Sequence, residues 1–105
     1  MTKYKIKFST IARDDLKELG YYIKEQLKEP ITAKRYITSM KNEIKSLEYF
    51  PMKYPQILEK GIKHSNTRKL IFKNFIIVYS IYEDKNTVII DRILYSGSNW
   101  QTLLH

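Results

Sequence analysis

The side chains with which this sequence could carry out a reaction are basic or aromatic, and most lie in its C-terminal half. Arg68 and Lys69 are adjacent, Arg92 interrupts an apolar run, and Tyr95 ends that run. RNA can be cleaved by its own 2′-hydroxyl group attacking the neighbouring phosphate, which needs a base, an acid and cations for the developing charge. We therefore predict these four residues as the candidate catalytic residues of a metal-independent RNA cleavage.

A second set of residues could bind nucleic acid. From Met52 to Asn74 the sequence carries six basic residues and one acidic residue, a net charge of +5. Segments of this kind attract polyanions mainly through charge. The candidate nucleic-acid-binding residues are Lys53, Lys60, Lys63, His64 and Lys73. His64 could also act as the base, because the pKa of histidine lies near neutrality.

Structural roles compete with these assignments. An arginine on an apolar strand can instead pair with a carboxylate, such as Asp91 or Glu83. Strand tyrosines can stack on a nucleobase, but they belong more often to a sheet core. Both interpretations stay open on the sequence alone.

Several classes of site are excluded or not expected. The chain has no cysteine, so it has no disulfide, thiolate metal site or cysteine nucleophile. His64 and His105 are its two histidines, too few for a multi-histidine metal site. It also lacks a glycine-rich phosphate loop and the serine-hydrolase elbow. We expect neither a metal nor a cofactor.

The length and charge limit the organisation and the partners. We expect residues 1–105 to form a single domain, because the chain is long enough for one modest core. The net charge of +8 favours a polyanionic partner, either nucleic acid or an acidic protein segment. The N-terminus has no apolar signal region, and no run is long enough to span a membrane. We therefore expect a cytoplasmic protein.

The elements expected to position these residues begin with a strand and two helices. Apolar residues alternate with lysines over residues 3–8, which predicts a strand with a lysine-bearing face at a sheet edge. A helix follows from a cap at Ser9 or Thr10, and a second helix runs from Pro30 to Pro51. Their short link predicts an antiparallel hairpin.

The remaining elements are strands joined by short turns. The predicted strands are residues 67–72, 75–82 and 87–95, with an additional short strand at 56–58 and a helical turn at 100–104. The short turns predict an antiparallel meander whose central strand is the most apolar. Asp91 and Arg92 are neighbours on the last strand, so we expect them to point to opposite faces. The order predicts an α+β fold, with the helical hairpin on one face of a small antiparallel sheet and the other face open for binding.

An ordered set of segments resembles the RelE/ParE superfamily of type II toxins. The matching segments are YKIKFSTIARDDLKELGYYI, LKEPITAKRYITSM, LEYFPMKYP, RKLIFKNFIIVYSIYED and VIIDRILYSGSNWQTLL. The resemblance implies a cytoplasmic toxin held inactive by a cognate antitoxin, which we expect to be acidic and encoded next to it. It also implies the fold expected above, with the open face of the sheet as the active surface.

Two departures from the family pattern leave the target open. RelE-type toxins that cleave mRNA on the ribosome carry an arginine where this chain has Ile76 or Ile77, and basic residues where it has 96–99, SGSN. The absence of these basic residues favours the ParE-like branch, whose implied target is DNA gyrase, whereas the basic segment 52–74 favours RNA. The sequence therefore predicts an mRNA-cleaving toxin, a gyrase inhibitor without enzymatic activity, or an inactive relative that retains only antitoxin binding.

Overall fold

The sequence patterns produce two helices and a four-stranded sheet in the computed structural model, which describes residues 2–58 and 66–97. The elements are β1 (Lys5–Phe8), α1 (Thr10–Leu27), α2 (Pro30–Lys45), the 3₁₀ helix η1 (Ser46–Glu48), β2 (Thr67–Phe72), β3 (Phe75–Tyr82), the 3₁₀ helix η2 (Glu83–Lys85) and β4 (Thr87–Tyr95). Ser9 caps α1 by accepting a hydrogen bond from the Ala12 N–H, as predicted. None of the described helices is long and apolar enough to cross a membrane.

The sheet has the strand order β1-β4-β3-β2. Strands β2, β3 and β4 form the predicted antiparallel meander, with β3 in the centre. Strand β1 lies at the edge, as predicted, but it pairs with β4 in parallel, from Lys5 beside Thr87 to Phe8 beside Ile90. The α+β fold is thus confirmed, while the sheet is mixed instead of purely antiparallel. A long connection through both helices separates β1 from β4, so no short turn forces these two strands to be antiparallel.

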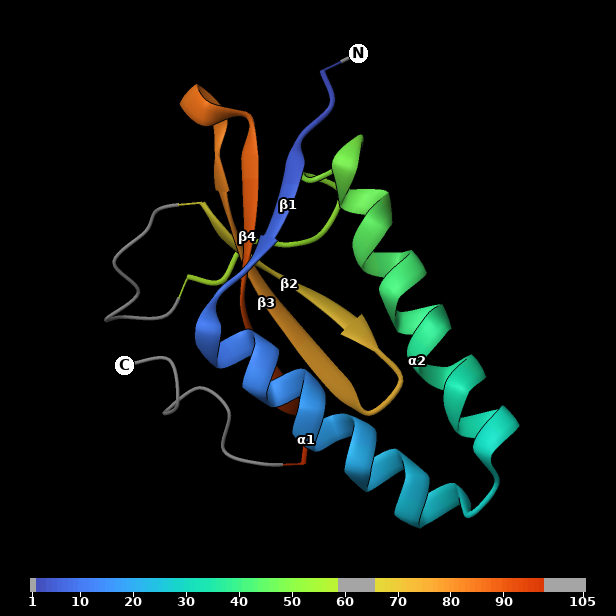
Figure 1. Cartoon of the computed structure of the whole chain (residues 1–105). Coiled ribbons are helices and arrows are strands. Elements are labelled where there is room, and N and C mark those ends of the chain that lie inside the picture. The colour runs from blue at the N-terminus through green and yellow to red at the C-terminus, as the bar shows by residue number, and fades with distance from the viewer. Residues whose placement is uncertain (1, 59–65, 98–105) are drawn as a thin grey trace.

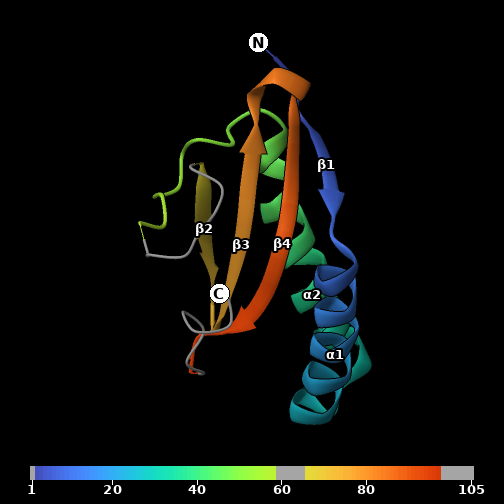
Figure 2. The same cartoon turned by 90° about the vertical axis from the view of Figure 1, so that its left-hand side faces the viewer.

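Both helices lie on one face of the sheet (Figures 1 and 2). Lys28 ends α1 in a left-handed conformation (φ 51°), and the two helices then run in opposite senses and diverge toward β1 and η1 (Figure 1). The main core lies between the helices and this helix-side face. It includes Leu19, Ile23, Met40, Ile44, Leu70, Ile77, Tyr79, Ile81 and Ile90. Alternation along β3 therefore directs every second residue toward the helices.

The opposite, helix-free face carries a smaller apolar cluster of Ile57, Ile76, Val78 and Leu94. Ile57 reaches it because the chain beside β2 forms ladder-like hydrogen bonds: Ile57 N–H donates to the Thr67 carbonyl (2.8 Å), and Lys69 N–H donates to the Pro55 carbonyl (3.1 Å). The strand predicted at 56–58 is reduced to a single bridge, between Gln56 and Arg68. Among the described residues, no helix lies over this face (Figure 2).

Candidate functional site

A β-bulge in β4 decides where its two charged residues point. The register with β3 shifts between Val78 and Tyr79, so that Val78 pairs with Arg92 and Tyr79 pairs with Ile90, leaving Asp91 as the extra residue. Asp91 accepts a 2.5 Å hydrogen bond from the Ser80 hydroxyl group, on the face that also carries Val78. Asp91 and Arg92 therefore both lie on the helix-free face. The prediction that they point to opposite faces is wrong, because a bulge interrupts the alternation of side chains.

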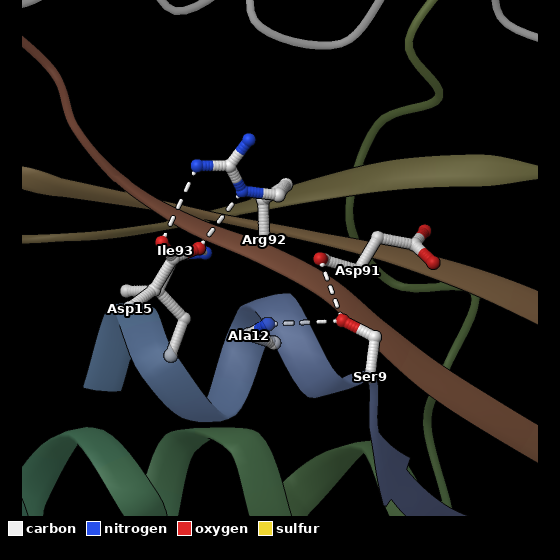
Figure 3. A network of polar contacts seen from close by, with 6 residues as sticks. All are labelled: Ser9, Ala12, Asp15, Asp91, Arg92 and Ile93. Atoms are coloured by element: carbon white, nitrogen blue, oxygen red, sulfur yellow. Dashed lines mark hydrogen bonds and ion pairs between the residues drawn. The ribbon is translucent and has the colours of Figure 1, made fainter. Parts of the chain in front are cut away.

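Arg92 is bound to a carboxylate of α1 (Figure 3). Its Nε and Nη2 atoms donate to the two carboxylate oxygens of Asp15 at 2.9 and 3.3 Å, and the Ile93 N–H donates to the same carboxylate at 2.9 Å. The two side chains are only 25% and 13% exposed. A forked pair of this kind neutralises the guanidinium group and fixes its orientation. Arg92 therefore has the structural role that the sequence also allowed, pairing with a carboxylate. Its partner is Asp15 and not one of the two residues named as examples, Asp91 and Glu83.

Ser9 and Asp15 together attach α1 to the part of β4 beyond the end of β1. Ser9 N–H donates to the Ile90 carbonyl (3.0 Å), and the Ser9 hydroxyl donates to the Asp91 carbonyl (2.9 Å). The carboxylate of Asp15 then receives the Ile93 N–H, which would otherwise lack a strand partner. We call Ser9, Asp15 and Arg92 the helix anchor.

Lys69 and Arg92 lie in one row across the helix-free face, because both are cross-strand partners of Val78. The next row toward η2 is polar: the Thr67 and Ser80 hydroxyl oxygens are 3.0 Å apart, and Ser80 donates to Asp91. These rows place two of the four predicted catalytic residues on one surface.

Arg68 lies on the other face, opposite Tyr79 of the helix-side core. Its Nη1 atom donates to the carbonyl groups of Met52 (3.0 Å) and Tyr54 (2.7 Å), and its Nε atom donates to the Asn66 side chain (2.9 Å). Tyr79 holds the same segment, because its hydroxyl group donates to the Pro51 carbonyl at 2.6 Å. We call Arg68 and Tyr79 the loop anchor of residues 51–54.

The Tyr79 hydroxyl group is not suited to proton transfer at neutral pH. Its side chain is fully buried, and burial raises the pKa of this phenol well above its usual value, outweighing the lowering effect of the nearby Arg68 charge. A buried, protonated phenol that already donates to a carbonyl stabilises the fold and is not a candidate acid or stacking platform.

Tyr95 lies on the helix side of the sheet, across from Phe75. Its ring contacts the ring of Phe75 (centroids 5.9 Å apart) and the ring of Tyr22 from α1 (6.4 Å). Arg68 and Tyr95 therefore face away from Lys69 and Arg92. The structure separates the four predicted catalytic residues into two pairs on opposite faces.

Two of the predicted nucleic-acid-binding residues are described, and both lie over aromatic rings. Lys73 Nζ is 4.6 Å from the ring centre of Tyr36, and Lys53 Nζ is 5.0 Å from that of Tyr54. Lys60, Lys63 and His64 lie outside the described residues, as do His105 and the helical turn predicted at 100–104. Within residues 2–58 and 66–97, no group of three potential ligands could hold a metal ion.

Asp15 was not among the predicted site residues, although the sequence contains a signal for it. Asp15 is three residues after Ala12 and four before Leu19, both of which are buried. A carboxylate on the buried side of an amphipathic helix needs a donor. With few arginines in the chain, Arg92 on an apolar strand was the natural candidate for that donor.

A groove of about 680 Å³ opens where the two helices diverge over β1. Its floor is apolar and includes Ile6, Phe8, Leu16, Ile37 and Ile44. Its exposed rim carries Arg13, Lys17, Lys41 and Lys45. Glu48, the one carboxylate among the described lining residues, is paired with Lys3 at 3.3 Å. We call this feature the interhelical groove; it combines an apolar floor with a rim of positive charge.

Comparisons with known proteins agree with this architecture. The family model for the ParE toxin of the type II toxin–antitoxin system parDE matches residues 6–100. A chain of the chromosomal ParDE system of P. aeruginosa aligns with a TM-score of 0.70 at 15% identity, covering 90% of this chain and 98% of that chain.

Other solved structures share the fold. A chain of the RelBE2 toxin–antitoxin complex of Mycobacterium tuberculosis aligns with a TM-score of 0.65 at 21% identity, covering 89% of this chain and 98% of that chain. The isolated RelE toxin of E. coli gives 0.56 at 17% identity, covering 95% and 93%. A search of curated proteins found no significant match in sequence.

Proposed function

Because the chain belongs to the ParE family and is a toxin of the type II toxin–antitoxin class, we propose that it arrests growth by binding DNA gyrase and not by cutting RNA. The observation that carries this proposal is the separation of the predicted catalytic residues. Arg68 and Tyr95 lie on the helix side, and Arg92 is neutralised by Asp15. Acid–base cleavage needs its acid, base and cations within hydrogen-bond reach of one phosphate. The choice of gyrase rests on the resemblance to the ParE branch.

Two parallel assays on the purified protein test this proposal. One measures ATP-driven supercoiling of relaxed plasmid by gyrase, and the other maps mRNA ends by primer extension in a cell-free translation extract. We expect inhibited supercoiling and intact mRNA. Normal supercoiling together with newly cut mRNA would contradict the proposal.

RNA cleavage remains a second candidate because Lys69 and Arg92 share a row on the helix-free face. If this face cleaves RNA, Lys69→Ala lowers the rate by about 100-fold, the usual effect of removing a group that stabilises a transition state. Lys24→Ala is the matched control, because Lys24 is an exposed lysine of α1, on the helix side of the sheet. Equal rates for the two variants would remove this candidate.

The hypothesis that the chain is an inactive relative predicts a different result in cells. A chain that retained only antitoxin binding would leave growth unaffected when expressed alone. We expect growth arrest under those conditions and recovery when the antitoxin is co-expressed.

We further propose that the antitoxin places an acidic amphipathic segment in the interhelical groove. The apolar floor fits the hydrophobic side of such a segment, and the four rim cations complement its carboxylates. An acidic partner also matches the net charge of +8.

Charge reversal at the groove tests the position of the antitoxin. Arg13→Glu combined with Lys41→Glu is expected to weaken antitoxin binding by at least tenfold in calorimetry, because two attractive contacts become repulsive. The control is Lys7→Glu with Lys85→Glu, which changes the net charge equally at exposed positions outside the groove. Equal weakening by both double variants would indicate a general charge effect and would contradict the groove assignment.

A further inference from the structure

A small pocket beside the helix anchor is lined by acidic, aromatic and apolar residues, although the chain as a whole is strongly basic. It has a volume of about 370 Å³ and lies between α1, the beginning of β3 and the end of β4. Its walls are largely aromatic and apolar, and its lining residues include Tyr22, Phe75, Tyr95, Asp15 and Glu18. We call it the aromatic pocket.

Three rings form a mutual cluster on its wall. The ring centres of Tyr22, Phe75 and Tyr95 are 5.9 to 6.4 Å apart, with interplanar angles of 53° to 78°. Phe75 is buried, whereas Tyr22 and Tyr95 are 46% and 48% exposed. The two tyrosines therefore expose part of their rings to solvent, on either side of the buried Phe75 ring. Aromatic faces carry partial negative charge and attract cations.

The charges of the lining point the same way. Asp15 and Glu18 line the pocket, and among the described residues no lysine or arginine does. The Asp15 carboxylate is already bound to Arg92, but exposed Glu18 forms no ion pair with the described residues. The interhelical groove, in contrast, has a rim of four cations. A chain with a net charge of +8 thus contains both an acidic aromatic pocket and a basic groove, each lined in part by α1.

We propose that the aromatic pocket binds the guanidinium group of an arginine side chain presented by a partner polypeptide. A guanidinium group is planar, so it can stack on a tyrosine ring while its N–H groups fork onto the Glu18 carboxylate. The pocket volume is near the lower end for small-ligand sites and suits one side chain. This assignment does not depend on whether the toxin acts on gyrase or on RNA.

The probe for this site is N-acetyl-arginine methylamide, added to the full chain at constant ionic strength. Two-dimensional ¹H–¹³C spectra of the tyrosine rings report binding. We expect saturable shifts of the Tyr22 and Tyr95 signals, and none with the citrulline analogue, which has the same shape without the charge. Absence of shifts, or equal shifts with citrulline, would overturn the proposal.

Matched variants on the same helix locate the binding. Glu18→Gln and Tyr22→Leu are each expected to weaken binding about threefold, the usual size of one exposed ion pair or cation–π contact. Glu25→Gln and Tyr21→Leu are the controls, because both residues are exposed on α1 and neither lines the pocket. All four positions are exposed, so the variants should fold. Equal weakening by a variant and its control would also overturn the proposal.

Discussion

The helix anchor and the loop anchor fasten chain segments to the sheet with the same kind of side chain, yet their electrostatics differ. Arg92 donates to a carboxylate, so its charge is cancelled locally. Arg68 donates to two backbone carbonyls and an amide oxygen, so its full charge remains. An arginine can therefore hold two chain segments together whether or not a carboxylate neutralises its positive charge. Arg68 and Arg92, both predicted as catalytic residues, do not act together, because Asp15 neutralises Arg92 and Arg68 faces the helices.

Removing the carboxylate from the helix anchor should have the largest effect on stability. Asp15→Ala leaves a mostly buried guanidinium group and the Ile93 N–H without their acceptor, so we expect a loss of about 2–4 kcal/mol in the free energy of unfolding. Urea unfolding followed by circular dichroism measures it. Asp14→Ala, at the exposed neighbouring position, should change stability by less than about 0.5 kcal/mol.

A double-mutant cycle tests whether the pair acts as a unit. Arg92→Met in the Asp15→Ala background should cost less than in the wild type, because the arginine is then already unpaired. Additive losses would show that Asp15 and Arg92 stabilise the protein independently, which would contradict the helix anchor.

Cutting the loop anchor should cost less than cutting the helix anchor. Arg68→Met removes three hydrogen bonds, but the carbonyls of Met52 and Tyr54 are neutral, and water can reach this partly exposed region. We expect a loss of about 1–2 kcal/mol. Arg68→Lys should restore only part of it, because a lysine lacks the fork that reaches several acceptors at once. A larger loss for Arg68→Met than for Asp15→Ala would reverse the comparison.

The two anchors also differ in how far the sequence could reveal them. Asp15 lies at a buried helical position and Arg92 on an apolar strand, so their pairing can be inferred from side-chain types. The acceptors of Arg68 are backbone carbonyls, which every residue carries, so no pattern of side chains identifies them. The same limit applies to the bulge at Asp91: a single extra residue is invisible to strand periodicity, yet it changes the face of the following side chain.

The elements themselves were predictable because their signals are local. Alternation in β2, the continuous apolar run of β3 and the apolar stripes of α1 and α2 each depend on a few neighbouring residues. The parallel pairing of β1 with β4 joins segments about 80 residues apart in the chain, and nothing in either strand specifies the direction. The positions of the candidate site residues depend on such long-range choices, which explains why the fold was easier to predict than the site.

The smallest expected effect belongs to the second member of the loop anchor and depends on pH. Tyr79→Phe removes the hydrogen bond to the Pro51 carbonyl and should cost about 1 kcal/mol at pH 8. The pKa of Tyr79 is raised by burial in the folded state, so the unfolded chain ionises first. The wild type therefore loses stability as the pH rises above about 10, by at most about 1.4 kcal/mol per pH unit from this group.

Phenylalanine cannot ionise, so the stability deficit of Tyr79→Phe should shrink above pH 10 and then reverse. Unfolding midpoints of both proteins between pH 8 and 11 measure this difference, in which the titration of the other tyrosines and the lysines cancels. Tyr21→Phe is the control, because Tyr21 is 74% exposed and should show a constant difference over the same range. A Tyr79→Phe deficit that stays constant to pH 11 would mean that the phenol is ionisable within the fold. The loop anchor would then be open to water, and the contrast with the helix anchor would be one of charge alone.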